Sequence, residues 1–293
     1  MRASDKWIDY KLIDASGGNR LEMWGDYILI RPDPQVIWDT PKTDPRWKKA
    51  HGIYRRSKTG GGGWQNFGMP DDWCVNYGEL TFKLRPMGFK HTGLFPEQAV
   101  NWDLTSELIR KRIKNGGEVS VLNMFAYTGG ATAAAANAGA SVVHVDAAKG
   151  MVQAAKENLQ LSGLGDAPVR YIVDDCRKFV EREIRRGRKY HGIIMDPPSY
   201  GRGPGGEVWK LEEAAFGLIS LAAKLLADEP LFFLINSYTT GISPSSMGYM
   251  LQSSMPEGMR SRGRMIADEI GLHVQNNGLV LPAGASAIWV ANE

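Results

Sequence analysis

The chain has 293 residues, of which 43% are hydrophobic and 23% are charged, a globular composition that excludes a disordered or fibrous protein. The length suits one domain of about 150–200 residues with a smaller one beside it. The formal net charge of +3 does not demand an anionic partner, but the basic residues are clustered and so permit one. The clusters are Lys48, Lys49, Arg55, Arg56 and Lys58; Arg110, Lys111, Arg112 and Lys114; and Arg182, Arg185, Arg186, Arg188 and Lys189.

The cysteines and the apolar runs indicate a cytoplasmic protein. Only Cys74 and Cys176 are present, and one possible disulfide would stabilise little, which suits a reducing compartment. The first residues, Met1 to Gly18, lack the basic and then apolar pattern of a secretion signal. The longest apolar run, Leu218–Ile235, is interrupted by charges and falls short of the ~18 apolar residues that a membrane helix needs.

Short strand-like segments separated by glycine and proline fill the first 92 residues. Tyr27–Pro32 is one such segment, and Leu80–Leu84 alternates apolar and polar residues as a half-buried strand does. The four glycines Gly60–Gly63 predict a mobile loop. We therefore expect a small β-rich N-terminal domain over residues 1–92.

From about Gly93 the pattern changes to apolar strands that alternate with helices. This alternation predicts βαβ units and a doubly wound, Rossmann-like, mostly parallel sheet over residues 93–293. Two short segments near the end predict a closing pair of strands, for which antiparallel pairing is one option. The expected strands are 119–124, 141–146, 169–173, 191–195, 231–236, 272–275 and 286–290, and the expected helices are 97–114, 131–138, 148–162, 176–186 and 211–227.

Polar or glycine-rich residues follow four of these strands, at the edge of a parallel sheet where ligands bind. After the first strand, 125–130 is glycine-rich and precedes a helix, so its backbone can approach a ligand and offer free N–H groups. Asp146 ends the second strand and could accept both hydroxyls of a ribose. Asp175 follows the third strand and could receive an adenine amino group. Asp196-Pro-Pro-Ser-Tyr200 follows the fourth, where two prolines fix the backbone and a tyrosine can stack on a flat substrate.

Taken together, these segments resemble class I S-adenosylmethionine-dependent methyltransferases, and most closely the bacterial ribosomal-RNA large-subunit methyltransferase group. The segments that carry the resemblance are Thr92–Gln98, Asn123–Gly129, Val145–Asp146, Asp174–Asp175 and Asp196–Tyr200. The resemblance implies S-adenosylmethionine as cofactor and an RNA substrate, with a catalytic loop that includes Asp196, Pro197 and Tyr200. The cofactor-binding residues that it implies are Gln98, Asn123, Phe125, Ala126, Tyr127, Thr128, Gly129, Asp146, Ala147, Asp175, Cys176 and Asp196.

The chain lacks the cysteine nucleophile that the carbon-5 methyltransferases of that group carry. Methylation of pyrimidine carbon-5 needs a cysteine thiolate that adds to the ring, and related enzymes carry it after the fifth strand or in the Asp-Pro-Pro loop. Here Ser237 and Ser199 stand in those regions, and a serine hydroxyl is a poor substitute. The sequence thus disfavours a carbon-5 reaction and leaves the target atom open; a nitrogen acceptor needs no covalent step.

Other functions stay open at this stage. A methyltransferase of a protein or a small molecule would keep the same donor site, and a catalytically silent module would hold the donor or RNA without turnover. A dinucleotide oxidoreductase is disfavoured because no G-x-G-x-x-G occurs. The five histidines are scattered and predict no metal site, and the oligomeric state cannot be read from the sequence.

Overall fold

The computed structural model describes residues 1–57, 61–202, 208–239 and 241–292. It divides the chain into two compact units. The first unit comprises Met1–Val100 with Gly271–Ala283, and the second comprises Asn101–Ile270 with Gly284–Glu293. The domain boundary that we expect at residue 92 stays a prediction.

The first unit is built on a five-stranded sheet with the order β2-β3-β4-β5-β6. β2 and β3 form a hairpin whose two loop residues, Gly17 and Gly18, both have positive φ (56° and 74°), as a tight primed turn requires. Ile13, Leu21 and Ile30 form its buried cluster. The strands of this unit are β2 (Tyr10–Ser16), β3 (Asn19–Trp24), β4 (Tyr27–Pro32), β5 (Gly52–Arg56), β6 (Gly62–Asn66) and the separate pair β7 (Trp73–Tyr77) and β8 (Leu80–Leu84); η1 (Pro45–Lys48) and η2 (Pro96–Gln98) are short 3₁₀ helices.

The glycine run gives a mixed outcome. Gly62 and Gly63 lie in β6, so the predicted loop is wrong at these two positions, while residue 60, like Lys58 of the basic cluster, lies outside the described residues. Gly62 is extended (φ 158°), and a Cβ there would lie 2.3 Å from the Arg55 carbonyl oxygen. A glycine is therefore required because β6 passes close to β5.

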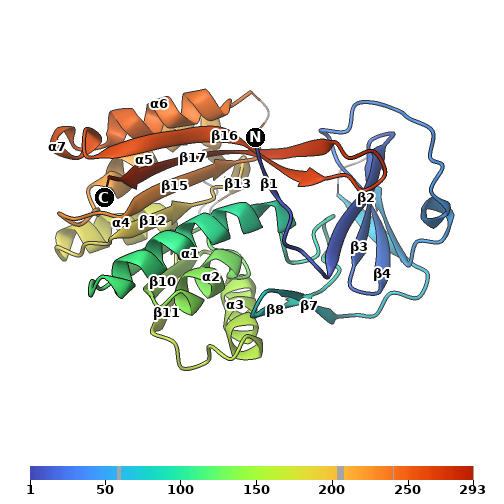
Figure 1. Cartoon of the computed structure of the whole chain (residues 1–293), viewed down its shortest axis with the longest axis horizontal. Helices are drawn as coiled ribbons and strands as arrows, with labels where there is room; N and C mark the ends of the chain where they lie inside the picture. The colour runs from blue at the N-terminus through green and yellow to red at the C-terminus, as the bar shows by residue number, and fades with distance from the viewer. Residues whose placement is uncertain (58–60, 203–207, 240, 293) are drawn as a thin grey trace. The chain divides into compact units, whose positions relative to one another are not determined.

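The second unit carries the predicted parallel sheet (Figure 1). The eight-stranded sheet has the order β1-β16-β17-β15-β12-β9-β10-β11, in which β15, β12, β9, β10 and β11 are parallel and β17 runs antiparallel to β15. This confirms the doubly wound α/β fold with a small β-rich sheet. The strands of the sheet are β1 (Arg2–Ser4), whose residues are assigned to the first unit, β9 (Ser120–Met124), β10 (Ser141–Asp146), β11 (Val169–Val173), β12 (Gly192–Met195), β15 (Phe232–Ser237), β16 (Gly263–His273) and β17 (Val280–Ala291), and β13 (Tyr200–Arg202) and β14 (Val208–Lys210) form a separate pair.

Helices cover both faces of the sheet because successive side chains of a strand point to opposite sides. Leu122 and Met124 of β9 belong to the large buried cluster that also contains residues of α4, α5 and α6. Asn123, between them, hydrogen-bonds Thr132 of α2 on the other side. The helices are α1 (Ala99–Lys114), α2 (Gly130–Asn137), α3 (Lys149–Leu161), α4 (Cys176–Arg185), α5 (Leu211–Ala223), α6 (Pro244–Ser254) and α7 (Glu257–Arg260).

The C-terminal part differs most from the expectation. β16 and β17 are longer than the predicted strands 272–275 and 286–290, and α6 and α7 were not predicted. Both long strands pass from one unit into the other, between residues 270 and 271 and between 283 and 284. In the first unit, the N–H groups of Gln275 and Asn276 donate to the carbonyl oxygens of Leu12 and Ile13 in β2 (2.9 and 3.0 Å).

In the described part of the chain, no helix is long and apolar enough to cross a membrane.

Candidate methyl-donor site

The loops that follow β9, β10, β11 and β12 meet at one edge of the sheet. The N–H of Ala126 donates to the carbonyl oxygen of Val145 (3.1 Å), and the N–H of Asp174 to that of Asp146 (3.1 Å). The N–H of Asp196 faces the carbonyl oxygen of Met124 at 3.4 Å. These backbone bonds bring together four segments that the sequence singled out: 123–130, 146–147, 174–176 and 196–200.

The loop after β9 holds an unusual backbone conformation. Phe125 and Tyr127 have φ values of 54° and 50°, in the left-handed region that bulky side chains rarely adopt. Each such residue costs about 1–3 kcal/mol and persists only when its surroundings enforce it. Strained backbone of this kind is often found at ligand-binding sites, so this loop is the best structural evidence for a binding site in the second unit.

Asp146 is the residue that holds this loop. Its Oδ2 accepts the N–H of Tyr127 (2.9 Å) and its Oδ1 accepts the N–H of Ala148 (2.8 Å). The side chain is only half-buried, and an ionised carboxylate can accept about four hydrogen bonds. It therefore keeps acceptor capacity for hydroxyl groups of a ligand, while Ala147 beside it is exposed.

Close packing sets the start of α2. Gly129 has φ 82°, and a Cβ there would lie 2.8 Å from the Cβ of Ala155 in α3, so only glycine fits. The carbonyl oxygen of the buried Thr128 accepts the side-chain amide of Asn158, also in α3 (2.8 Å). Sequence reasoning missed Ala155 and Asn158, because a helix residue that supports a distant loop carries no local motif.

Asn123 supports the site from within the sheet. It is 3% exposed, and its amide donates to the hydroxyl of Thr132 (2.9 Å), which in turn contacts Nδ1 of His144 (2.9 Å). Burial lowers the pKa of His144 to about 4, so the ring is neutral. The predicted cofactor contact of Asn123 stays a prediction, and its visible role is to connect β9, α2 and β10.

Asp175 and Cys176 begin α4. Asp175 is exposed and caps the helix by accepting the N–H of Lys178 (2.9 Å). Cys176 is 3% exposed, and its Sγ accepts the N–H of Phe125 (3.4 Å). Burial raises the pKa of this thiol to about 12, so the sulfur stays protonated. Cys176 thus supports the strained loop.

The segment after β12 is held by contacts that the sequence did not suggest. The carbonyl oxygen of Pro198 accepts the indole N–H of Trp209 (2.7 Å), whose ring centroid lies 5.8 Å from that of Phe125. The hydroxyl of Ser199 accepts that of Thr239 (2.6 Å), which follows β15. Asp196 is half-buried, Pro197 is buried, and Tyr200 is 53% exposed at the start of β13. Nothing in the sequence around Trp209 or Thr239 signalled these contacts.

Gln98 lies in the first unit, in the short helix η2, and is 6% exposed. Its predicted cofactor role stays a prediction, as do the roles of the other residues named from the sequence. Among the described residues, no group of three or more histidine, cysteine or acidic side chains is arranged to hold a metal ion.

The chain is similar to known proteins over more than half of its length. A family model described as S-adenosylmethionine-dependent methyltransferase matches residues 50–212, more than half of the chain. A crystal structure of a SAM-dependent methyltransferase from Agrobacterium tumefaciens is 33% identical, covers 99% of this chain and 93% of its own, and has a TM-score of 0.92. The chain belongs to the S-adenosylmethionine-dependent methyltransferase family. The expected family and S-adenosylmethionine as the cofactor are thereby confirmed.

Curated relatives match parts of this methyltransferase. Ribosomal RNA large subunit methyltransferase K/L of Shewanella frigidimarina is 38% identical over 120 residues, which are 41% of this chain and 16% of the relative. Ribosomal RNA large subunit methyltransferase K of Neisseria meningitidis is 27% identical over 198 residues, 66% of this chain and 51% of the relative. The methyltransferase thus spans about half or less of the curated relatives that it matches.

The residues at the strand edge suit the chemistry of the cofactor. The methionine part of S-adenosylmethionine carries a carboxylate, which the N–H groups of a glycine-rich loop before a helix can bind. Its ribose offers two hydroxyls, which suit the half-buried carboxylate of Asp146. Its adenine offers an amino group, for which the exposed Asp175 is a suitable acceptor.

Proposed function

We propose that this methyltransferase methylates a base of ribosomal or other RNA without a cysteine nucleophile. The observation that carries the proposal is that the strained Phe125–Gly129 loop and the Asp196–Tyr200 segment lie together. The N–H of Asp196 faces the carbonyl oxygen of Met124, directly before the loop. Trp209 hydrogen-bonds to Pro198 and packs against the ring of Phe125. The names of the curated relatives, which are ribosomal RNA large subunit methyltransferases, support RNA as the substrate.

The state of the two cysteines supports a reaction without a covalent enzyme–base intermediate. Both are free thiols. Cys176 is buried with a raised pKa, and Cys74 lies in the other unit. The Ser199 hydroxyl accepts a hydrogen bond from Thr239, and no histidine or carboxylate among the described residues hydrogen-bonds to it to act as a base. A nucleophilic addition to pyrimidine carbon-5 is therefore disfavoured.

S-adenosylmethionine supplies an electrophilic methyl group on its sulfonium when it is bound. The residues of the chain then hold the donor and the acceptor in line, and such positioning can lower the activation free energy of methyl transfer by about 7–11 kcal/mol. We assign to Asp196 and the carbonyl oxygen of Pro197 the role of accepting hydrogen bonds from an amino group, while the exposed ring of Tyr200 is available to stack on a base. Stacking of this kind contributes about 1–3 kcal/mol per base.

We also propose that the protein is cytoplasmic, because two free thiols suit a reducing compartment and ribosomal RNA is the favoured substrate.

The direct test measures methyl transfer from radiolabelled S-adenosylmethionine to ribosomal RNA. We expect the wild type to label the RNA and Asp196→Asn to lose at least about a hundredfold in rate, with donor binding measured separately by calorimetry. Asp166→Asn, an exposed aspartate elsewhere in the second unit, is the matched control and should keep full activity.

A wild type that binds the donor but labels no RNA would contradict the proposal. Labelling of a protein or metabolite extract would then favour another acceptor, and no labelling at all would favour a silent binding module.

A further inference from the structure

An open concavity of about 450 Å³ lies in the first unit, and none of the donor-site residues described above lines it. Three elements line it: the β2–β3 turn at Gly18 and Asn19, the end of β4 and the residues after it between Pro32 and Val36, and Tyr54–Arg56 of β5. Its lining therefore combines strand ends with the turn and loop residues that follow them. Arg55 and Arg56, both exposed, give it a positive wall.

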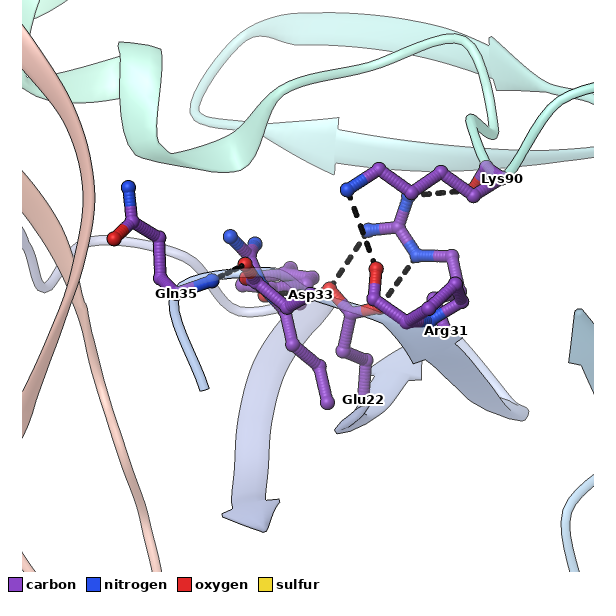
Figure 2. A network of polar contacts seen from close by, with 8 residues as sticks. Glu22, Arg31, Asp33, Gln35 and Lys90 are labelled. Atoms are coloured by element: carbon purple, nitrogen blue, oxygen red, sulfur yellow. Dashed lines mark hydrogen bonds and ion pairs between the residues drawn. The ribbon is translucent and has the colours of Figure 1, made fainter. Parts of the chain in front are cut away.

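The acidic groups next to the concavity are already neutralised. Asp33 is 3% exposed and pairs with Arg20, and it also accepts the N–H of Gln35 (2.9 Å). Behind it, Glu22 is fully buried and pairs with Arg31 through two hydrogen bonds of 2.6 and 2.8 Å (Figure 2). These carboxylates therefore do not cancel the charge of the arginines on the wall.

A third cation contacts the lining of the concavity. The Lys90 ammonium donates to the carbonyl oxygen of Pro32 (3.2 Å), a lining residue, as Figure 2 shows. Burial, together with the positive charges of nearby arginines that include Arg56, lowers the pKa of Lys90 to about 8, although Asp33 opposes the shift. An anion in the concavity would relieve this crowding of positive charge.

An exposed aromatic residue lies in a segment that hydrogen-bonds to the lining of the concavity. The phenol of Tyr54 donates to the carbonyl oxygen of Gly88 (3.4 Å), and the indole N–H of Trp64 donates to that of Met87 (3.0 Å). Between Gly88 and Lys90, both of which contact lining residues, Phe89 is 68% exposed. Exposed arginines together with an exposed phenylalanine are the combination that binds single-stranded nucleic acid, because the cations bind phosphates and the ring stacks on a base.

Arg55 and Arg56 differ in how they are held. The Nε of Arg55 donates to the side-chain oxygen of Gln65 on β6 (3.1 Å), which fixes the guanidinium and leaves its terminal nitrogens for an acceptor. Within the described residues, the side chain of Arg56 has no hydrogen bond or ion pair.

We propose that this concavity binds the phosphodiester backbone of a single-stranded RNA segment through Arg55 and Arg56, with Phe89 stacking on a base. The inference rests on the proposed function, since it makes the first unit a second contact for the RNA substrate. It assigns a role to one part of the basic cluster Lys48–Lys58 that the donor site does not use.

The test measures binding of the intact protein to a short fluorescently labelled single-stranded RNA at several salt concentrations. For Arg55→Gln/Arg56→Gln we expect weaker binding and a salt dependence of log K smaller by about 1.4, the value for two phosphate contacts on a single strand. For Phe89→Ala we expect about a tenfold loss of affinity with an unchanged salt dependence, because stacking releases no counterions. Lys48→Gln/Lys49→Gln removes the same charge from exposed positions outside the concavity and should change affinity less than about threefold.

Three outcomes would overturn the proposal. In the first, the wild type fails to bind the RNA, and in the second, the arginine variant binds it as the lysine control does. In the third outcome, the concavity binds inorganic phosphate, but the affinity for RNA is the same with and without phosphate. Thermal unfolding of each variant checks that it folds. Methyl transfer to RNA is measured separately for each variant. If the arginine variant methylates RNA normally and binds it as the wild type does, this proposal is rejected, while the proposed function is retained.

Discussion

Two carboxylates of the first unit and two of the second play opposite parts. In the first unit, Glu22 and Asp33 are buried and each is matched to an arginine, so their hydrogen-bonding capacity is used inside the protein. In the second unit, Asp146 and Asp175 lie at strand ends, accept backbone N–H groups and remain partly or fully exposed. The comparison indicates that burial with a paired cation marks an acid that supports the fold, whereas exposure at a strand end marks an acid that can bind a ligand.

The largest effect is expected from Glu22→Gln, which tests the structural half of this comparison. The change leaves Arg31 buried with no opposite charge, which typically costs about 3–5 kcal/mol of unfolding free energy. Chemical denaturation measures the loss, and donor binding by the folded fraction should not change. Glu79→Gln in the exposed β7–β8 turn is the control. A loss no greater than that of the control would show that the pair does not stabilise the unit.

The same pair predicts a pH dependence. Burial alone would raise the pKa of Glu22, but the charge and hydrogen bonds of Arg31 outweigh it, and the net pKa is lowered. A group whose folded pKa is lowered contributes stability above its unfolded pKa and loses it as the pH falls through the folded value. The stability difference between wild type and Glu22→Gln should therefore shrink below about pH 4.5, near the ordinary pKa of glutamate.

Asp146→Asn tests the binding half. The amide cannot accept two backbone N–H groups and ribose hydroxyls as the carboxylate can, and hydrogen bonds to a charged group are worth about 1.5–3 kcal/mol each. We expect affinity for S-adenosylmethionine to fall by about a hundredfold in calorimetry, with a smaller loss of stability than Glu22→Gln causes. Full affinity in this variant would remove Asp146 from the donor site.

Gly129→Ala should cost about 2–3 kcal/mol, since the new Cβ combines a left-handed backbone with an overlap at Ala155. Gly163→Ala separates the two causes, because Gly163 also has positive φ (71°) but nothing lies within 4 Å of its Cβ position. We expect the control to lose about 1 kcal/mol. Equal losses in thermal unfolding would mean that the α2–α3 approach does not require glycine.

The smallest effect is expected at Cys176. Because the thiol is buried and its pKa is raised, iodoacetamide at about pH 8 should modify Cys74 in the folded protein and leave Cys176 unmodified, as mass spectrometry of peptides would show. Cys176→Ser, which keeps an acceptor for the N–H of Phe125, should keep methyl transfer within about threefold of the wild type, since addition of a thiolate to the base is not part of the proposed reaction. Loss of transfer, with donor binding intact, would restore the cysteine as a nucleophile.

Much of the fold and of the candidate site could be predicted from local patterns. The strands 169–173, 80–84 and 27–32 coincide with β11, β8 and β4, because apolar periodicity and turn residues mark such elements. The aspartates after β10, β11 and β12 were predicted to share one edge because parallel strands end there together. Phe125 and Tyr127 were named as cofactor-binding residues from the family resemblance, but their positive φ values could not be predicted, because neither residue type favours that conformation.

The features that sequence reasoning missed depend on contacts between distant residues. Trp209 and Thr239 are joined to the Asp196–Tyr200 segment only by the fold. α6 begins at a serine cap followed by proline, Ser243-Pro244, a start signal that is readable but easily assigned to a loop. The ends of β16 and β17 were missed because pairing between the strands, more than apolar alternation, extends them.

The course of β16 and β17 has a consequence for synthesis. Residues 271–283 complete the first unit and hydrogen-bond to β2, which leaves the ribosome more than 250 residues earlier. One flank of β2 in the amino-terminal sheet therefore stays unpaired until residues 271–283 have been translated. A nascent chain stalled before residue 271 should be open to proteases at its amino-terminal end even when the parallel sheet has already formed.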